Sequence, residues 1–359
     1  MNHLSETIEN HIRAKWPMIC FVKPNTTLIE FWFSQGRSLE KSTEGLQFFI
    51  QGFDPKLPAQ IWSSNSFDKI DIDLLELGDY FSESEMSLGS GSFPDSAEHR
   101  QSHEQLIDAG IKAIQDGSIS KVVLSRVQEF NTHEVDWLRL FWRLTQVDQN
   151  AFRYLLLHPD YGLWSGATPE ILISVKNRDF STMALAGTRW RHEGKFPEWT
   201  PKEHEEHQWV VREILQALAP CAKFKQSQIT NHRAGALEHL RSDIYGRLDE
   251  NASVLDLARS LHPTPAVCGF PKNKALRFIQ DNEGYERGLY TGYLGLSNPE
   301  EKSAEFYVNL RCLRYDHSRF HLYVGGGITK DSIFDHEWQE TKRKMTTMGQ
   351  VIAPFIEQR

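Results

Sequence analysis

The sequence is poor in cysteine and has no long run of apolar residues. Its four cysteines are Cys20, Cys221, Cys268 and Cys312, and none is spaced as CxxC. We therefore expect no disulfide framework and no zinc knuckle, and a reducing compartment, the cytoplasm. No apolar stretch is long enough to cross a bilayer, and the first residues, MNHLSETIENHIRAKWP, are polar and mixed in charge, unlike a signal peptide. The sequence thus predicts no membrane association.

Positive charge is outweighed by negative charge. The formal net charge is −8 at pH 7, so the chain carries no basic footprint for nucleic acid. Neither a P-loop nor a dinucleotide-binding glycine pattern occurs. At 359 residues the chain can bury a large core, in one big domain or two.

Strand-like and helix-like segments come in groups along the chain. The segment FSESEMSLGSGSFPDSAEHR, rich in Ser, Gly and acidic residues, is typical of an exposed connection. After it, apolar spacing predicts helices at 96–117, 201–219, 253–261, 271–283 and 336–350. Strands are predicted at 121–130, 152–158, 170–175, 181–186, 286–294, 303–314 and 319–325. Because strict βαβ alternation is absent, we expect a mixed or largely antiparallel α+β fold.

The stretch TPKEHEEHQWVV begins a helix whose buried face carries carboxylates. Thr200, Pro201 and Glu203 have the form of a capping box with proline at the first position, so capping alone explains Glu203. Helical spacing also places Glu203 and Glu206 in one stripe with the apolar residues that follow them. Buried carboxylates are costly unless they are paired or bound to a cation.

A second helix repeats this arrangement. In DHEWQETKRKMTTMGQVI, Glu337 and Glu340 lie in one stripe with Lys344 and then apolar residues. Two such glutamate pairs meeting in a cleft would form an oxygen-rich site that suits Mg²⁺. Taken singly, each pair is more typical of a solvated helix face than of a set of metal ligands, and only the two pairs together make the two interpretations about equal. A zinc site is not favoured, because HEEH lacks the HExxH spacing.

Several other segments carry polar groups at special positions. Lys121 begins a strand on the face opposite its apolar neighbours, and Glu170 follows a proline at the start of another. Either could be no more than a charge at a strand edge. SLHPTPAVCGFPK is a rigid, proline-rich loop, and YVGGGIT places three glycines after a strand, where backbone N–H groups can approach an anion. Arg311, within a strand, requires an anionic partner.

These segments together resemble the chorismate-utilising enzymes, which include isochorismate, salicylate, anthranilate and aminodeoxychorismate synthases. The similarity lies in KVVLSR, ATPEILI, LAGTR, EEHQWVV, LHPTPAVCGFPK, ERGLYTGYLG, NLRC, GGGI and EWQETKRK, in this order. It covers residues 96–359, which we expect to be the chorismate-binding catalytic region. Residues 1–95 would be a variable N-terminal portion packed on the same fold.

The resemblance implies two packed, mostly antiparallel sheets flanked by helices, with chorismate and Mg²⁺ in a central cleft. By motif position, Glu206 and Glu340 resemble the direct metal ligands, and Glu203 and Glu337 resemble partners acting through water. Further positions resemble groups that bind the substrate: Tyr290, Arg311, Gly325, Gly326, Gly327 and Lys344 at its carboxylates; Ala186, Gly187 and Thr188 near the leaving oxygen; and His262 near the ring or enolpyruvyl group. His262 could equally be a loop histidine with its hydrogen bonds satisfied.

The position of Lys121 resembles that of the members that add water, since those that use ammonia generally have Gln there. The resemblance then implies that Lys121 activates water for attack at C2 and Glu170 protonates the departing C4 hydroxyl. Isochorismate synthase, for menaquinone or siderophore biosynthesis, is the favoured expectation, and a compact chain favours menaquinone. Salicylate synthase, an anthranilate or aminodeoxychorismate synthase component, and a silent chorismate-binding subunit are the alternatives. We expect no obligate glutaminase partner, and a monomer or weak homodimer.

Overall fold

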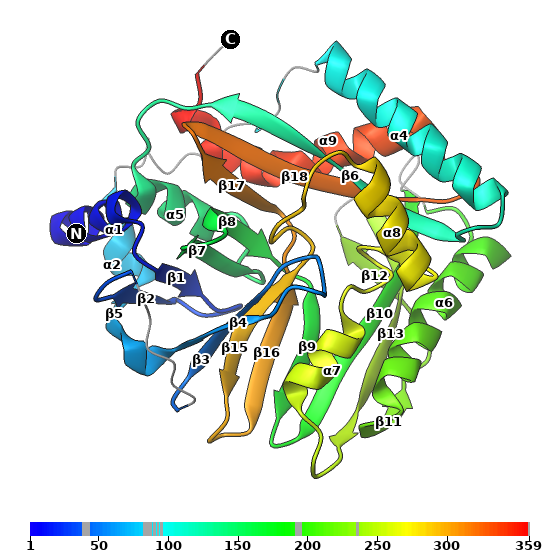
Figure 1. Ribbon diagram of the computed structural model, residues 1–359, viewed down its shortest axis with the longest axis horizontal. Helices are drawn as coiled ribbons and strands as arrows, with labels where there is room; N and C mark the ends of the chain where they lie inside the picture. The colour runs from blue at the N-terminus through cyan, green and yellow to red at the C-terminus, as the bar shows by residue number, and fades with distance from the viewer. Residues whose placement is uncertain are drawn as a thin grey trace.

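A computed structural model describes residues 1–37, 44–81, 88, 91, 93, 96–190, 196–234 and 237–357. Its strands form two large sheets, and every strand pairing within them is antiparallel. Helices lie outside the sheets (Figure 1). The predicted α+β class is therefore confirmed. Residues 82–87, 89–90, 92 and 94–95 of the predicted connection lie outside the described residues.

The first sheet contains nine strands. In spatial order these are β14 (Gly269–Phe270), β6 (Lys121–Asn131), β18 (Arg319–Ile328), β17 (Cys312–Asp316), β8 (Gly162–Thr168), β7 (Phe152–His158), β1 (Met18–Val22), β2 (Leu28–Ser34) and β5 (Phe67–Asp73).

The second sheet runs through eight strands, and a further strand, β12 (Thr230–Ala234), pairs with β13. In spatial order the eight are β11 (Ala222–Gln226), β13 (Leu237–Leu248), β10 (Asp179–Trp190), β9 (Ile171–Lys176), β16 (Ser303–Val308), β15 (Tyr293–Asn298), β3 (Gln47–Gln51) and β4 (Gln60–Ser63). Strands from the first 73 residues thus extend both sheets.

Helices cover the outer faces of both sheets (Figure 1). Against the first sheet and its N-terminal edge pack α1 (Asn2–Ala14), α2 (Leu74–Gly78), α4 (Ala97–Gln115), α5 (Trp137–Thr145), α8 (Lys272–Asn282) and α9 (Phe334–Ile352). Against the second pack α6 (Pro201–Leu218) and α7 (Val254–Leu261). Short 3-10 turns occupy η1 (Ser64–Ser66) and η2 (Ala353–Phe355). No helix among the described residues is both long and apolar enough to cross a membrane.

Strand alternation divides the core into layers. In β1, Met18 and Cys20 contribute to the cluster beneath α1, α5 and α9, whereas Ile19 and Phe21 point into the layer between the sheets. The layer between the sheets is rich in aromatic residues and continues to Tyr290 and Tyr323 at one end. That end borders the cleft described below.

Two predicted strands differ from the structure. The chain predicted as a strand at 286–294 is a turn up to Gly292, and β15 begins at Tyr293. The strand predicted at 303–314 is two strands, β16 and β17, interrupted at residues 309–311. Buried hydrogen bonds explain the interruption, since the Asn309 side chain donates to Leu289 O and accepts from Tyr154 Oη.

Candidate active site

A cleft of about 1010 Å³ opens between the two sheets. One wall comes from β6, β18 and α9, and the other from β10, β13 and the N-terminal end of α6. Of the predicted site residues, it brings together Lys121, Glu170, Ala186, Gly187, Glu203, Glu206, Tyr290, Arg311, Gly325, Gly326, Gly327, Glu337, Glu340 and Lys344. The Thr188 side chain lies outside the described part of the structure.

Lys121 reaches the cleft from the first residue of β6. Its neighbours Val122 and Leu124 point to the opposite face, into the core beneath α4 and α8, as the alternation predicts. Lys121 is only 7% exposed, and its Nζ lies 2.5 Å from Glu206 Oε1 on α6. The pair joins a strand of one sheet to a helix covering the other.

Glu170 enters the same cleft from the other sheet, immediately before β9. Its backbone carbonyl accepts a hydrogen bond from Val308 N, which ties this position to β16. Burial raises the pKa of its carboxyl, while the charges of Lys344, Arg311 and Lys121 act in the opposite direction and offset only part of that rise. Glu170 therefore retains its proton to a higher pH than an ordinary glutamate, which suits a proton donor.

The N-terminal end of α6 has the predicted capping box. Glu203 Oε2 accepts hydrogen bonds from Thr200 N, at 2.8 Å, and from the Thr200 hydroxyl. The backbone of this turn lies against Gly187, which forms a bulge in β10 with φ +75°. A Cβ at Gly187 would come within 3.1 Å of Glu203 O, which is a tight contact, and the positive φ is a conformation that favours glycine.

The N-terminal half of α9 supplies the other acidic pair. Lys344 Nζ lies 2.7 Å from Glu340 Oε1 and donates to Gly325 O at 2.8 Å. A Cβ on Gly326 would lie 3.3 Å from Glu337 Oε2 and 3.9 Å from Glu340 Oε1, so both carboxylates lie over this glycine. The three glycines belong to β18 itself, which corrects the prediction that they follow a strand.

Arg311 and Tyr290 contribute further polar groups to the cleft. The prediction that Arg311 lies within a strand is wrong, because it precedes β17 in a bend with φ +46°. Tyr290 lies in the turn before β15 and is 3% exposed, and burial raises the pKa of its phenol. Its hydroxyl therefore remains a neutral hydrogen-bond donor.

His262 does not line the cleft, contrary to the prediction for a substrate contact. Its ring is buried, and Nε2 donates to the carbonyls of Gly52 and Phe53 at 3.1 Å each. Burial lowers its pKa to about 4, so it is the satisfied loop histidine that the sequence equally allowed.

Three other histidines, His232, His239 and His336, do line the cleft, and none was singled out from the sequence; His239 lies on β13. It pairs in register with Thr188 and hydrogen-bonds the backbone of Gly187, and burial lowers its pKa. Leu240 and Ile244 alternate as buried residues in the same strand. That alternation in EHLRSDI is typical of a strand. It would also have predicted that the His239 side chain points to the face opposite Leu240.

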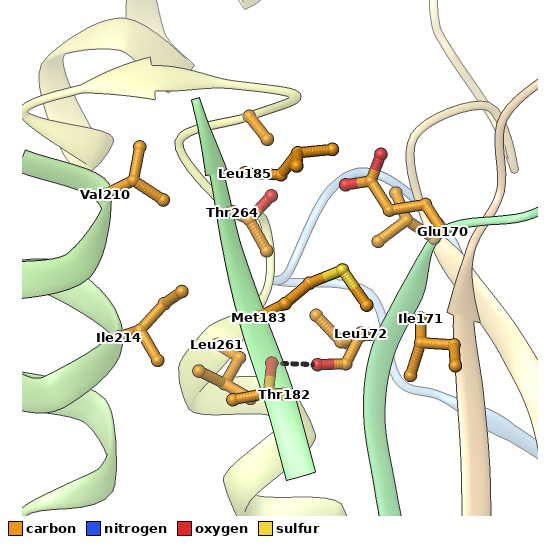
Figure 2. A pocket seen from close by; sticks show the side chains of 12 residues that line it. Glu170, Ile171, Leu172, Thr182, Met183, Leu185, Val210, Ile214, Leu261 and Thr264 are labelled. Carbon is orange, nitrogen blue, oxygen red and sulfur yellow. Dashed lines mark hydrogen bonds between the residues drawn. The ribbon is translucent and has the colours of Figure 1, made fainter. Parts of the chain in front are cut away.

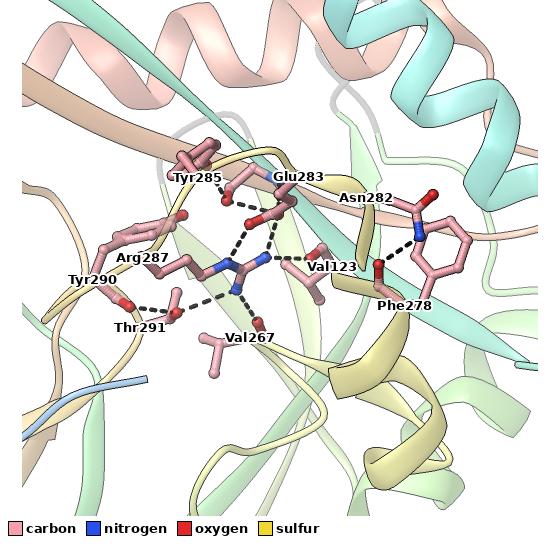
Figure 3. Close-up of polar contacts among 10 residues, drawn as sticks. Val123, Val267, Phe278, Asn282, Glu283, Tyr285, Arg287, Tyr290 and Thr291 are labelled. Carbon is pink, nitrogen blue, oxygen red and sulfur yellow. Dashed lines mark hydrogen bonds and ion pairs between the residues drawn. The ribbon is translucent and has the colours of Figure 1, made fainter. Parts of the chain in front are cut away.

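A fully buried ion pair between Arg287 and Glu283 lies next to residues that line the cleft (Figure 3). Arg287 Nη2 lies 2.6 Å from Glu283 Oε1 and donates to Val123 O at 2.7 Å. Arg287 Nη1 donates to Val267 O, at 2.9 Å, and to Thr291 Oγ1, at 3.2 Å. One guanidinium thus ties β6 to the proline-rich loop and to the turn that carries Tyr290.

The cleft offers oxygen donors suited to a hard cation. Among the residues that the structure describes, no three His, Cys, Asp or Glu side chains gather into a metal-binding group. Mg²⁺ needs fewer protein ligands than three, because one or two carboxylates together with water and substrate oxygens complete its coordination shell. Glu206 and Glu340 lie in the same cleft, each beside a lysine, and this donor set fits such a cation.

Residues 66–350 match the family model of the chorismate binding enzymes. The chain is 30% identical over 270 residues to the salicylate biosynthesis isochorismate synthase of Pseudomonas aeruginosa, covering 72% of this chain and 56% of that protein. It spans between 56% and 66% of the length of the first curated relatives it matches.

Two solved structures share the fold. One, from Bacillus anthracis, is named for a 2,3-dihydroxybenzoate-specific isochorismate synthase and has a TM-score of 0.75 at 23% identity, over 98% of this chain and 99% of that one. The other, the menaquinone-specific isochorismate synthase of Escherichia coli, has a TM-score of 0.73 at 20% identity, over 94% and 89%. At these identities they establish the fold alone. The match of the family model to residues 66–350, which are most of this chain, establishes that the chain belongs to the chorismate-binding enzymes.

Proposed function

We propose that this protein is an isochorismate synthase, which isomerises chorismate by adding water at C2 and expelling the C4 hydroxyl. The observation that carries the proposal is the meeting of Lys121 and Glu170, from different sheets, in one cleft. Lys121 supplies an amine and Glu170 a carboxyl with a raised pKa, and these are group types that serve as general base and general acid. The names of the relatives, among them isochorismate synthases of Pseudomonas aeruginosa and Escherichia coli, support the same activity.

The reaction balances with these residues alone as proton carriers. Lys121 takes a proton from water as the water oxygen bonds to C2. The ring double bond shifts, the C4–O bond breaks, and the Glu170 proton leaves with the hydroxyl as water. One water enters and one leaves, and the proton then returns from Lys121 to Glu170 through solvent, so both residues are reset and the net change is an isomerisation.

The substrate is a dianion, and the cleft supplies groups that bind carboxylates. Arg311, Lys344 and the neutral Tyr290 hydroxyl line it, beside the backbone of Gly325–Gly327. Charge-assisted hydrogen bonds to a carboxylate are the strong class of such contacts. Ala186 provides no amine that could act as a nucleophile in place of water.

We further propose that Mg²⁺ is held directly by Glu206 and Glu340, and through water by Glu203 and Glu337. When bound, it would neutralise a substrate carboxylate. The support is the chemistry of the donor set and its place in the cleft. A menaquinone-specific and a vibriobactin-specific isochorismate synthase both occur among the proteins with similar fold or sequence, and isochorismate is common to both names.

The test is turnover of chorismate in ¹⁸O-labelled water, with the products separated by chromatography. Isochorismate labelled at the C2 hydroxyl is expected, and high ammonium should give no aminated product. Anthranilate or aminodeoxychorismate would contradict water as the nucleophile. Stoichiometric salicylate and pyruvate without an added lyase would make the protein a salicylate synthase instead.

A further inference from the structure

A small pocket of about 20 Å³ lies behind Glu170, on the side toward α6 and α7 (Figure 2). Most of its wall is apolar and comes from Leu172, Met183, Leu185, Val210, Ile214 and Leu261. Two side-chain hydroxyls and one carboxyl also reach it, from Thr182, Thr264 and Glu170.

The two hydroxyls differ in their hydrogen bonding. Thr182 Oγ1 donates to Leu172 O at 2.7 Å, so its donor is satisfied. Thr264 Oγ1 is buried and has no hydrogen-bond partner in the described structure. Figure 2 shows the Thr264 hydroxyl and the Glu170 carboxyl facing the same gap, with Met183 and Leu185 around it. A buried hydroxyl without a partner is costly, and such a group indicates a ligand.

The pocket has the size of a single water molecule. A water requires roughly 10–15 Å³ of space and two or more polar partners. The volume of about 20 Å³ accommodates one water and no larger ligand, and Thr264 and Glu170 supply two partners. Thr264 is also held in place, because its carbonyl accepts hydrogen bonds from Val267 N and Cys268 N at 3.1 and 3.0 Å.

We propose that an ordered water bridges the Thr264 hydroxyl to the Glu170 carboxyl, and that Thr264 is a positioning residue for the proton donor. The hydroxyl donates to the water, and the water donates to Glu170 as its carboxyl loses the proton. This assignment of a role rests on the proposed function, whereas the water site itself does not.

The charged neighbours of the Glu170 carboxyl all lie on its cleft side. The proposed water would provide a hydrogen bond on the other side. Those neighbours are Lys121 from β6, Arg311 before β17, Lys344 from α9 and, as a titratable hydroxyl, Tyr290. On the opposite side the wall is largely apolar, and a carboxylate formed against such a wall is destabilised. The water offers a hydrogen bond there when the negative charge appears.

The test compares Thr264→Val with Thr264→Ser, which keeps the hydroxyl. High-resolution crystal structures should show the water in the wild type and in Thr264→Ser, and not in Thr264→Val. We expect Thr264→Val to lower kcat roughly tenfold, the size of one hydrogen bond to a charged group, with KM little changed. The alkaline limb of its kcat profile should move to higher pH, because the lost donor had favoured the carboxylate.

Thr182→Val is the matched control, since it removes the other hydroxyl of the same pocket. It should lower thermal stability and leave the pH profile of kcat where it is in the wild type. A dry pocket in the wild type, or a Thr264→Val enzyme with wild-type kcat and pH profile, would overturn the proposal. If the wild type does not convert chorismate, the proposed function fails, and the crystal structures still decide the water.

Discussion

Lys121 and Glu206 form an ion pair across the cleft, with 2.5 Å between Nζ and Oε1. The pair joins the residue proposed as the base to a residue proposed as a metal ligand. Removing the lysine side chain therefore does two things at once: it deletes the amine and leaves a largely buried carboxylate without this partner. The two effects must be separated before a loss of activity can be assigned to proton transfer.

Lys121→Arg separates the loss of the amine from the loss of the ion pair with Glu206. Arginine retains the positive charge beside Glu206 but cannot give up its proton at ordinary pH. We expect turnover to fall by roughly 10²–10⁴-fold with the melting temperature near that of the wild type. Lys121→Ala should lose turnover and stability together. Lys112→Arg on the exposed face of α4 is the control, and wild-type turnover by Lys121→Arg would remove the lysine from the mechanism.

Glu170→Gln tests the proton donor. The amide preserves the shape of the carboxyl but cannot protonate the leaving hydroxyl, so kcat should fall by roughly 10²–10⁴-fold with KM little changed. In the wild type, kcat should decline as the pH rises through the raised pKa of Glu170, because only the protonated form is active. Steady-state kinetics across pH measures both effects. Glu301→Gln, on an exposed turn, should behave as wild type; near wild-type kcat in Glu170→Gln would dismiss the assignment.

The metal proposal predicts that EDTA abolishes turnover and that Mg²⁺ restores it. Glu206→Gln and Glu340→Gln should each be severely impaired, since each removes a hard anionic ligand. Independently of activity, Mg²⁺ should raise the melting temperature of the wild type but not of these variants, because only binding to the folded state stabilises it. Glu205→Gln, exposed on the same helix as Glu206, is the matched control. Full turnover after rigorous chelation would refute the proposal.

The helices carrying the acidic pairs were predictable because their signals are local. The capping box at Thr200 and Glu203 fixes where α6 begins, and spacing of three and four residues sets its buried face. The same periodicity places Glu337 and Glu340 on the inner face of α9. Such patterns depend on neighbouring residues in the chain, so one sequence contains them.

Positions set by contacts between distant segments were not predictable in this way. His262 turns from the cleft because Gly52 and Phe53, far away in sequence, offer carbonyls to its ring. Arg311 leaves the strand because Asn309 is held by Leu289 and Tyr154. No local periodicity encodes these partners, and the same holds for the pairing of Lys121 with Glu206.

The buried pair of Glu283 and Arg287 predicts a large stability effect. Glu283→Gln would leave the guanidinium in the core without its counter-charge, and breaking a buried pair costs about 3–5 kcal/mol. Asp256→Asn, in the exposed pair with Arg259, should cost below about 1 kcal/mol. Urea unfolding compares the free energies. A loss for Glu283→Gln no larger than for Asp256→Asn would show that the buried pair does not stabilise the fold.

The buried His262 should contribute to the loss of folding stability at acidic pH. Its pKa is lowered from 6.5 to about 4 by burial, so between these values the unfolded chain binds a proton that the folded chain does not. Its contribution to stability is complete above pH 6.5 and is lost as the pH falls toward 4. The shift corresponds to about 3 kcal/mol.

Unfolding free energies at neutral pH and near pH 5 test this contribution. His262→Gln retains a donor for the carbonyls of Gly52 and Phe53 but does not titrate, so it should lose less stability on acidification than the wild type. His317→Gln, whose side chain is 91% exposed, should follow the wild-type curve. Carboxylates also titrate in this pH range, but they do so in the wild type and in both variants. A difference in acid dependence between these proteins therefore comes from the histidine that was replaced. Identical acid dependence in His262→Gln and the wild type would mean that His262 is not held neutral in the folded state.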